Sequence, residues 1–299
     1  MLDPKTIRNL SRAKAEKLER LIEAVEKRIE TAQTTLTKSV LQEFLEKLTI
    51  EQGKIKEVQN RRTVTLFNQA YKIFQERQKE KLVKSILGDI NEILEDNGKF
   101  YTKTVEASPL TQDEVKKIVN RRLGIDTDGN LIRNGYMSGV LEDSTLKTDI
   151  QKYIFKEIFK GVGYEALKEG LKMKIEGDKD RLGMLQRHYK TFSYDVYAQL
   201  NSYTSKVYAD KLGLFHFIYN GGIIKTSRAF CKTKNGKVFS NEEAEQWVDD
   251  PTLTAIDSKE TYDWLIDRGG YNCRHTIDFI SKEIAFVLRP DLKEAESRA

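Results

Sequence analysis

The sequence predicts an α+β protein with a long N-terminal helical arm or hairpin, a mainly helical middle region and a small C-terminal α+β domain with a β-hairpin. Apolar residues recur three or four positions apart through most of the chain, which is the spacing of one helix face. Only 4 prolines occur and 32% of the residues are charged, a combination that favours long solvated helices. After residue 213 this spacing gives way to short apolar runs separated by Asn-Gly turn signals. We therefore divide the chain into residues 1–108, 109–186, 187–290 and a tail, 291–299.

The first region, residues 1–108, is predicted to be a helical arm or coiled coil. One apolar stripe runs from Ile7 to Ala32, a second covers residues 40–58, and a third covers residues 67–94. Such seams can form an intramolecular bundle or a surface for neighbouring subunits. Residues 96–98, Asp-Asn-Gly, are predicted to end the last helix.

The second region, residues 109–186, is predicted to be mainly helical. Residues 99–111 are expected to form an extended linker before it, and Thr111 and Glu114 have the spacing of a capping box. Asp126 and Asp128 resemble part of a calcium loop but lack its closing glutamate, so a glycine-bearing turn between two short strands is the preferred interpretation. Short helices separated by glycines follow.

The third region, residues 187–290, is predicted to combine a helix with strands. Aromatic residues recur along residues 188–212 and are expected to form core. Short strands should follow, with Asn235-Gly236 as the turn of a β-hairpin. Residues 268–281 are typical of a glycine turn that enters a strand, and the tail beyond is expected to be disordered.

The charge of the chain permits contact with DNA without requiring it, because the formal net charge is +5. Arg61-Arg62 and Arg121-Arg122 are candidate contacts to double-stranded DNA of any sequence, although both pairs could simply be solvated helix faces. The start of the chain lacks the pattern of a signal peptide, and no run of about 18 apolar residues is present, so we expect neither export nor a membrane span. Two cysteines are too few for a disulfide framework, which suits a reducing cytoplasm.

Three C-terminal pieces occur in a definite order: KLGLFHFIYNGG, then TSRAFCKTKNGKVF, then GGYNCRH. In this order they resemble the MuF-like phage head morphogenesis domain, which also occurs in minor capsid proteins of tailed bacteriophages. The matching positions are Ser227, Arg228, Cys231, Asn235, Gly236, Lys237, Phe239, Gly269, Gly270, Asn272, Cys273, Arg274 and His275. The resemblance covers about the last 110 residues; the N-terminal arm lies outside it.

The resemblance implies a structural minor head protein that takes part in head morphogenesis, with no catalytic residues. Its partners would be the phage portal and/or major capsid protein, and packaged DNA could touch it during packaging or ejection. It would be made in the bacterial cytoplasm and reside in the virion head, with no membrane and no small-molecule substrate. Many relatives carry four cysteines in these segments, whereas here residues 232–234 supply no second thiol and His275 replaces the last cysteine. A complete four-cysteine metal site is therefore not inherited.

The chemistry of Cys231, Cys273 and His275 leaves three alternatives open. Two buried thiols beside a structural histidine, a zinc or other soft-metal site completed by His188 or His216, and a disulfide formed outside the reducing cytoplasm are all compatible with the residues. All three require the three side chains to lie close together. Arg228 and Arg274 are expected to hold loops through backbone carbonyls or carboxylates.

Other functional classes have weaker support in the sequence. A metal-dependent His/Cys nuclease would need a general base and a metal shell, but the chain has only 3 histidines and no catalytic grouping of acids around His275. No phosphate-binding loop is present, which argues against an ATP-driven packaging motor. A toxin module after this domain would have no room, and a head scaffold acting on the procapsid is the remaining alternative.

Overall fold

The structure is a computed structural model that describes residues 2–55, 60–141 and 144–296. The chain forms two compact units, which are described separately. Unit 1 comprises Met1–Glu23, Asp89–Gly135 and Tyr194–Ala299, and unit 2 comprises Ala24–Gly88 and Tyr136–Ser193. These units do not coincide with the predicted divisions after residues 108 and 186, because each unit combines segments that are distant in the sequence.

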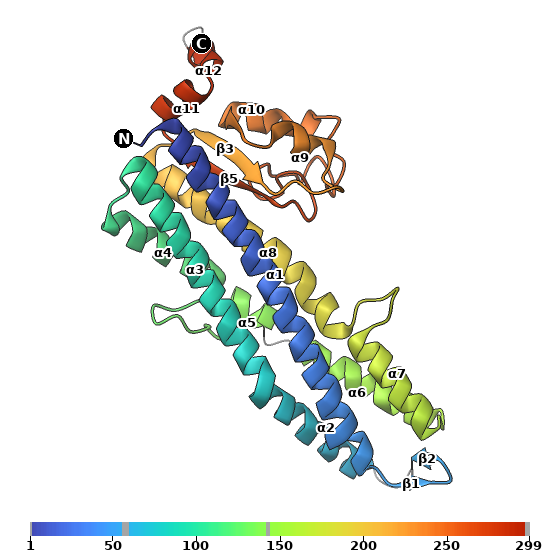
Figure 1. Ribbon diagram of the computed structural model, residues 1–299. Coiled ribbons are helices and arrows are strands. Elements are labelled where there is room, and N and C mark those ends of the chain that lie inside the picture. Colours follow the sequence, from blue (N-terminus) through green and yellow to red (C-terminus); the bar gives the residue numbers. More distant parts are fainter. Residues whose placement is uncertain (1, 56–59, 142–143, 297–299) are drawn as a thin grey trace. The chain divides into compact units, whose positions relative to one another are not determined.

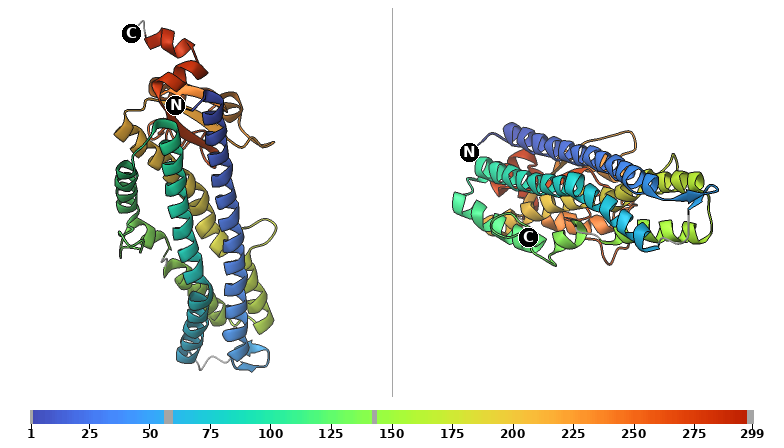
Figure 2. Two further views of the ribbon diagram at one scale, coloured as in Figure 1. Left: turned by 60° about the vertical axis from the view of Figure 1, so that its left-hand side comes forward. Right: turned by 90° about the horizontal axis from the view of Figure 1, so that it is seen from below.

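The predicted helical arm is helical, as expected. Helix α1 spans Pro4–Glu43, and α2 (Asn60–Phe74), the π-helical turn η3 (Gln75–Lys79) and α3 (Glu80–Val105) follow one another without a break. The apolar stripe of α1 is buried along its whole length, from Ile7 to Val40. Within unit 1, α1 and α3 lie side by side (Figure 2), where Lys17 forms ion pairs with Glu92 and Asp96.

The described part of unit 2 is mainly helical and includes one small hairpin. It contains the 3-10 turn η1 (Leu45–Lys47), strands β1 (Ile50–Glu51) and β2 (Lys54–Ile55), and helices α5 (Tyr136–Leu141), α6 (Ser144–Phe159) and α7 (Tyr164–Glu176). Gly53 has a φ of 75°, which the tight turn between β1 and β2 requires. The rings of Phe44, Phe67, Tyr71 and Phe74 form a continuous aromatic core.

The predicted end of the helix at residues 96–98 is wrong, and so is the extended linker over residues 99–111. Helix α3 continues to Val105 because the side chain of Asn97 is buried and bonded to partners on other helices. Helix α4 (Pro109–Leu123) then begins at Ser108, whose hydroxyl accepts the N–H of Thr111. The predicted cap at Thr111 is therefore three residues late.

Unit 1 contains a three-stranded antiparallel sheet in the order β4-β3-β5. The strands are β3 (His216–Gly221), β4 (Lys237–Ser240) and β5 (His275–Ile280). Helix α8 (Met184–Leu212) precedes β3; α9 (Ala229–Lys234), α10 (Asn241–Glu245) and the 3-10 turn η4 (Gln246–Asp249) surround β4; α11 (Lys282–Leu288) and α12 (Asp291–Glu296) end the chain. Residues 291–296, predicted to belong to a disordered tail, are thus helical. Leu200 and Val207 of α8 are buried as predicted.

The sheet lies between two different layers (Figure 1). Alternation along β3 sends Phe217 and Tyr219 to one face, where Phe230 of α9 and Trp247 of η4 cover them. The opposite face packs on α1, α3 and α8, since Asp278 of β5 bonds to residues of α1. The aromatic face of the sheet is the one that carries the residues of the predicted motif.

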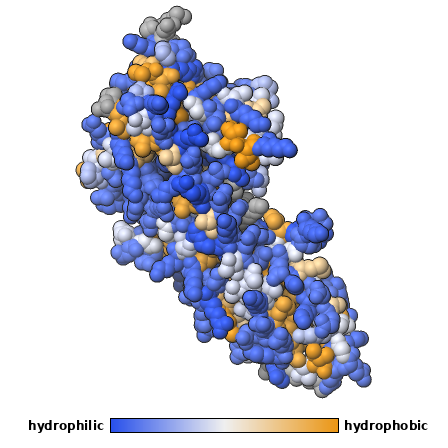
Figure 3. All heavy atoms as spheres, viewed as in Figure 1, coloured by the Kyte–Doolittle hydropathy of each residue, from blue (hydrophilic) through white to orange (hydrophobic). Residues whose placement is uncertain are grey.

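The predicted hairpin at Asn235-Gly236 is wrong. Residues 229–234 are helical, so no strand lies directly before the Asn235-Gly236 turn, and β4 pairs with β3 across the intervening helix α9. The segment around Asp126 is a turn closed by a single bridge between Ile125 and Leu131, with Gly129 at a φ of 84°. None of the described helices is long and apolar enough to cross a bilayer. Hydrophilic side chains cover most of the face in Figure 3, with small apolar patches between them.

Candidate metal-binding site

Cys231, Cys273 and His275 meet on the aromatic face of the sheet. Their three ligand atoms all lie within 4.8 Å of one another, which confirms the predicted proximity. The two sulfurs are 3.8 Å apart, and the Cys273 sulfur is 3.7 Å from Nδ1 of His275. The three side chains are at most 3% exposed. They form a buried group that could hold a metal ion.

Each side chain of this group comes from a different local structure. Cys231 lies on α9, Cys273 lies in the turn before β5, and His275 is the first residue of β5. Gly221 is paired with His275, and a Cβ at Gly221 would lie 2.9 Å from Cγ of the imidazole. Glycine at position 221 therefore leaves space for the His275 ring.

Tyr219 is the residue of this site that the sequence analysis missed. Its ring stacks on the His275 ring, with 4.6 Å between the ring centroids. Its hydroxyl lies 3.3 Å from the Cys273 sulfur and 3.7 Å from the Cys231 sulfur. Tyr219 and His275 are diagonal neighbours on adjacent strands, because Tyr219 pairs with Ile277. The sequence signal that could have identified Tyr219 is the alternation of side chains along β3, which places Tyr219 on the same face as Phe217.

Two glycines let the turn of residues 267–274 pack closely against its surroundings. A Cβ at Gly269 would lie 2.5 Å from the Cys231 sulfur, 3.0 Å from the Tyr219 oxygen and 3.2 Å from the Cys273 sulfur. Glycine at position 269 therefore lets the turn approach these three atoms closely. Gly270 has a φ of 87° and would meet the Ala255 carbonyl oxygen if it carried a Cβ.

Two arginines hold the loops of the site. Arg228 donates from Nη1 to the carbonyl oxygen of Gly269 at 3.1 Å and from Nη2 to that of Tyr271 at 2.5 Å. Arg274 forms an ion pair with Glu19 of α1. These contacts tie α9 to the turn and the turn to α1, so both arginines fix loops.

The remaining motif residues have backbone roles or lie at the surface. The side-chain oxygen of Asn235 accepts the N–H of Gly221 at 3.0 Å, and the N–H of Gly236 donates to the carbonyl oxygen of Tyr219 at 2.7 Å. Lys237 is exposed in β4, and Asn272 is exposed with a φ of 56°.

The two thiols have opposite acidities. Burial opposes ionisation of Cys273, but hydrogen bonds from Cys231 and His275 and the nearby charge of Arg268 outweigh it and hold its pKa well below the usual value. The pKa of Cys231 is raised because its thiol bonds to the Cys273 sulfur and is buried. The protein alone therefore favours one thiolate and one thiol at this site.

The donor chemistry fits a soft metal such as zinc. Thiolate sulfur and imidazole nitrogen are the ligands of closed structural zinc sites. Nδ1 of His275 faces the Cys273 sulfur, whereas Nε2 is buried without a hydrogen-bond partner among the described residues. A cavity of about 10 Å³ beside His275 and Cys273 is large enough for about one water molecule. His216, one predicted fourth ligand, lies on the other face of the sheet against Phe286; the side chain of His188 is outside the described residues.

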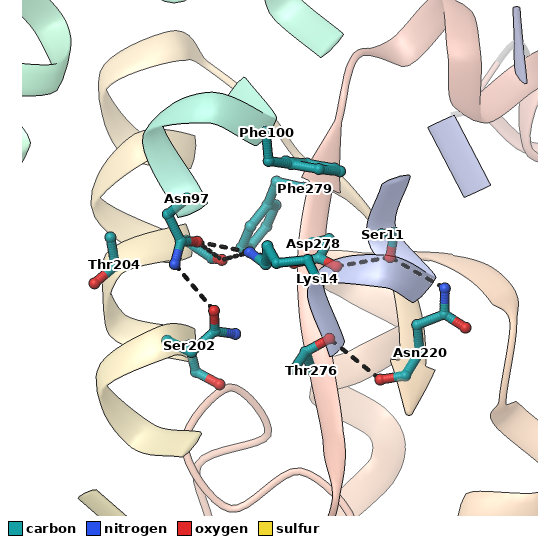
Figure 4. Close-up of polar contacts among 12 residues, drawn as sticks. Ser11, Lys14, Asn97, Phe100, Ser202, Thr204, Asn220, Thr276, Asp278 and Phe279 are labelled. Atoms are coloured by element: carbon teal, nitrogen blue, oxygen red, sulfur yellow. Dashed lines mark hydrogen bonds and ion pairs between the residues drawn. The ribbon is translucent and has the colours of Figure 1, made fainter. Parts of the chain in front are cut away.

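A buried polar network holds the opposite face of β5 (Figure 4). Lys14 of α1 lies 2.6 Å from one carboxylate oxygen of Asp278, and the hydroxyl of Ser11 donates to the other oxygen at 2.6 Å. Lys14 also donates to the side-chain oxygen of Asn97 at 2.6 Å. Asn220 donates to Ser11 at 3.1 Å, which links β3 to the same network. These bonds fix the strands that carry Tyr219 and His275.

The predicted DNA-contact residues are not gathered into one patch of one unit. Arg62 is exposed on α2 in unit 2, whereas Arg121 and Arg122 are exposed at the end of α4 in unit 1. The guanidinium of Arg122 stacks on the ring of Tyr203 at 4.4 Å. The side chain of Arg61 lies outside the described residues.

Comparison with known proteins finds no matching family model, no matching curated protein and no matching solved structure.

Proposed function

We propose that this chain is a structural minor head protein of a tailed bacteriophage, which binds portal and/or major capsid subunits during head morphogenesis. The observation that supports the proposal is that motif residues separated by about 40 positions gather around one buried group: Arg228 bonds to Gly269, and Cys231 lies beside Cys273. Residues of one motif with a shared structural role are expected to lie together in the fold. The chain would be made in the host cytoplasm and reside in the virion.

Burial of the group supports a structural role over a catalytic one. Cys231, Cys273 and His275 are covered by the aromatic layer, and the adjoining cavity of about 10 Å³ has no space for a substrate. A nuclease would need an accessible metal with a general base beside it. Among the described residues, the group contains no carboxylate.

We assign zinc to Cys231, Cys273 and His275 as a structural ion. In a small sheet with short strands, one ion would join α9, the turn before β5 and β5 itself, and its binding energy would contribute to folding. Elemental analysis of protein purified without added metal should find about one zinc per chain. Metal-free protein with two free thiols would contradict this assignment in favour of packed thiols, and a mass lower by two hydrogens would favour a disulfide.

Contact with DNA is a minor part of the proposal. Arg62 and Arg121 are exposed and could meet phosphates, while Arg122 is partly engaged by Tyr203. Such contacts would be independent of sequence and secondary to the contacts with head proteins.

Quantitative mass spectrometry of purified particles tests the proposed function. The chain should be present in mature particles at a low copy number relative to the major capsid protein. Its absence from particles would contradict the proposal and favour the alternatives, a head scaffold or an enzyme acting on phage DNA.

A further inference from the structure

A groove at the end of the aromatic face lies outside the candidate metal site. It has a volume of about 560 Å³, and all of its lining residues belong to unit 1. They come from the C-terminal end of α8, the start of β3, helix α10, the turn of residues 262–265 and the end of β5. A groove of this volume can accept a small ligand or a short peptide segment.

Apolar side chains line this groove, and one of them is an exposed phenylalanine. The aromatic and larger aliphatic lining residues include Phe215, Tyr262, Trp264, Leu265 and Phe279. The register of β3 and β4 continues one residue beyond the strands, because the N–H of Asn241 donates to the carbonyl oxygen of Phe215 at 3.0 Å. Alternation therefore places Phe215 on the same face as Phe217. Trp264 stacks on Phe217 with 5.1 Å between the ring centroids, whereas Phe215 is 60% exposed, so the aromatic layer ends at an uncovered ring.

Acidic side chains give the groove a negative charge. Three carboxylates and one ammonium group line it, those of Asp210, Glu245, Asp263 and Lys206. Lys206 donates to both carboxylate oxygens of Asp210, at 2.9 and 3.0 Å, so these two charges offset each other. Glu245 and Asp263 are exposed and form no ion pair among the described residues. The groove therefore presents two unpaired carboxylates beside aromatic rings.

Local hydrogen bonds hold the walls of the groove in place. The Asp263 carboxylate accepts the N–H of Leu265 at 2.9 Å, which fixes the turn that carries Trp264. A capping box of Ser240 and Glu243 fixes the start of α10, which also lines the groove. Because these walls are ordered before binding, a short segment would not have to offset the cost of ordering them.

We propose that this groove binds a peptide segment of another head protein, in which a lysine or arginine stands beside an aromatic or aliphatic residue. The apolar side chain would cover Phe215, and the cation would lie between the aromatic rings and the carboxylates of Glu245 and Asp263. Like-charge repulsion argues against nucleic acid and against an anionic membrane surface as the occupant. The inference rests on the proposed function only for the class of protein that supplies the segment.

Calorimetric titration of the full chain with two short peptides tests this groove. The probes are acetylated and amidated Gly-Lys-Phe-Leu-Lys-Gly and its acidic counterpart, Gly-Glu-Phe-Leu-Glu-Gly. We expect the basic peptide to bind with a Kd of about 10 to 100 µM and the acidic peptide to bind at least about 10-fold more weakly. Phe215→Ala removes the uncovered ring and Glu245→Lys reverses one charge, so each should weaken binding of the basic peptide by about 10-fold.

Val287→Ala and Glu95→Lys are the matched controls. Val287 is exposed on α11 and Glu95 is exposed on α3, and neither lines the groove, so both variants should bind the basic peptide as the wild-type protein does. Binding should also change the fluorescence emission of Trp264. Trp264→Phe should remove that change, because the other tryptophan, Trp247, is buried.

Three results would overturn the inference: equal binding of the two peptides, no binding of either at about 1 mM, or losses in the control variants equal to those of Phe215→Ala and Glu245→Lys. Dimerisation of the free chain that Phe215→Ala abolishes would overturn it in favour of a second copy as the occupant. The particle measurement is independent of these results. A chain that binds the peptide but is absent from particles would contradict only the proposed head function, and a chain present in particles that binds no peptide would contradict only this inference.

Discussion

Lys14 and Asp278 illustrate how single residues determine the packing of unit 1. The side chains are 6% and 0% exposed and form an ion pair in which Ser11 and Asn97 satisfy the remaining bonds. Burying two charges is costly, and their attraction compensates only when both are present and well bonded. Both residues could have been found in the sequence: Lys14 stands on the apolar stripe of α1 between Ile7 and Leu18, and Asp278 stands inside an apolar strand. These two exceptions to the apolar pattern are the signal of the buried pair.

We predict that Lys14→Met lowers the free energy of unfolding by about 3 to 5 kcal/mol, because it leaves the Asp278 charge buried and unpaired. Urea unfolding followed by circular dichroism measures this change. Lys206→Met is the matched control, since Lys206 pairs with Asp210 at the surface and its loss should change the free energy of unfolding by less than about 1 kcal/mol. Similar losses for the two variants would contradict the importance of the buried pair.

Gly269 gives a second prediction at this scale. Gly269→Ala should destabilise the protein by about 1 to 3 kcal/mol and reduce its zinc content, because the new Cβ would crowd the Cys231 sulfur. Gly88→Ala serves as the control: this glycine lies within α3 with open space around its Cβ position, and alanine there should raise the melting temperature slightly. An increase in stability for Gly269→Ala would contradict the close packing of this turn against the Cys231 sulfur.

Helices and strands could be predicted from the sequence where the local pattern agrees with the tertiary contacts. The prediction was wrong where the local pattern and the tertiary contacts conflict. The long helices follow from their apolar spacing. Asn97-Gly98 has the composition of a helix end, but Asn97 is satisfied by Lys14 and Asn201, so α3 continues. The Asn-Gly signal after residues 229–234 predicts a strand there, whereas the N–H of Gly236 donates to the carbonyl oxygen of Tyr219 and the segment forms α9. In both segments, contacts with residues that are distant in the sequence determine the structure.

The predicted boundary after residue 108 would allow residues 109–299 to fold independently, but the contacts of α1 and α3 with the sheet argue against it. We expect this fragment to lack cooperative unfolding, because it loses Ser11 and Lys14 of α1 and Tyr101 of α3, all of which contact β5. Thermal unfolding by circular dichroism, with the full chain as the control, measures this. A fragment that melts in one transition near the temperature of the full chain would restore the original division.

At the scale of the whole molecule, the sequence predicted the α+β class and the clustering of Cys231, Cys273 and His275. It did not predict that each compact unit would combine distant segments, because residues 1–23 and 89–108 reveal no contact with the C-terminal sheet in their own pattern. Tyr219, whose hydroxyl lies beside the two sulfurs, was also missed, since a tyrosine in a buried strand is usually part of the core.

DNA binding by the whole molecule should be weak and steeply salt-dependent. A net charge of +5 distributed over helices of mixed sign provides few phosphate contacts. Filter binding across a range of salt concentrations, with duplexes of different sequence, measures this property. Tight retention at about 0.3 M salt, or a marked sequence preference, would be incompatible with non-specific contact through a few arginines.

The central claim is that the buried Cys231, Cys273 and His275 group is a structural metal centre. Thermal unfolding of the purified chain with and without a strong chelator tests it most directly, with Cys273→Ser as the comparison. We predict that the chelator lowers the melting temperature of the wild-type protein, because metal binding contributes to folding, and leaves the already destabilised variant unchanged. A wild-type melting temperature that is the same with and without chelator would contradict the claim.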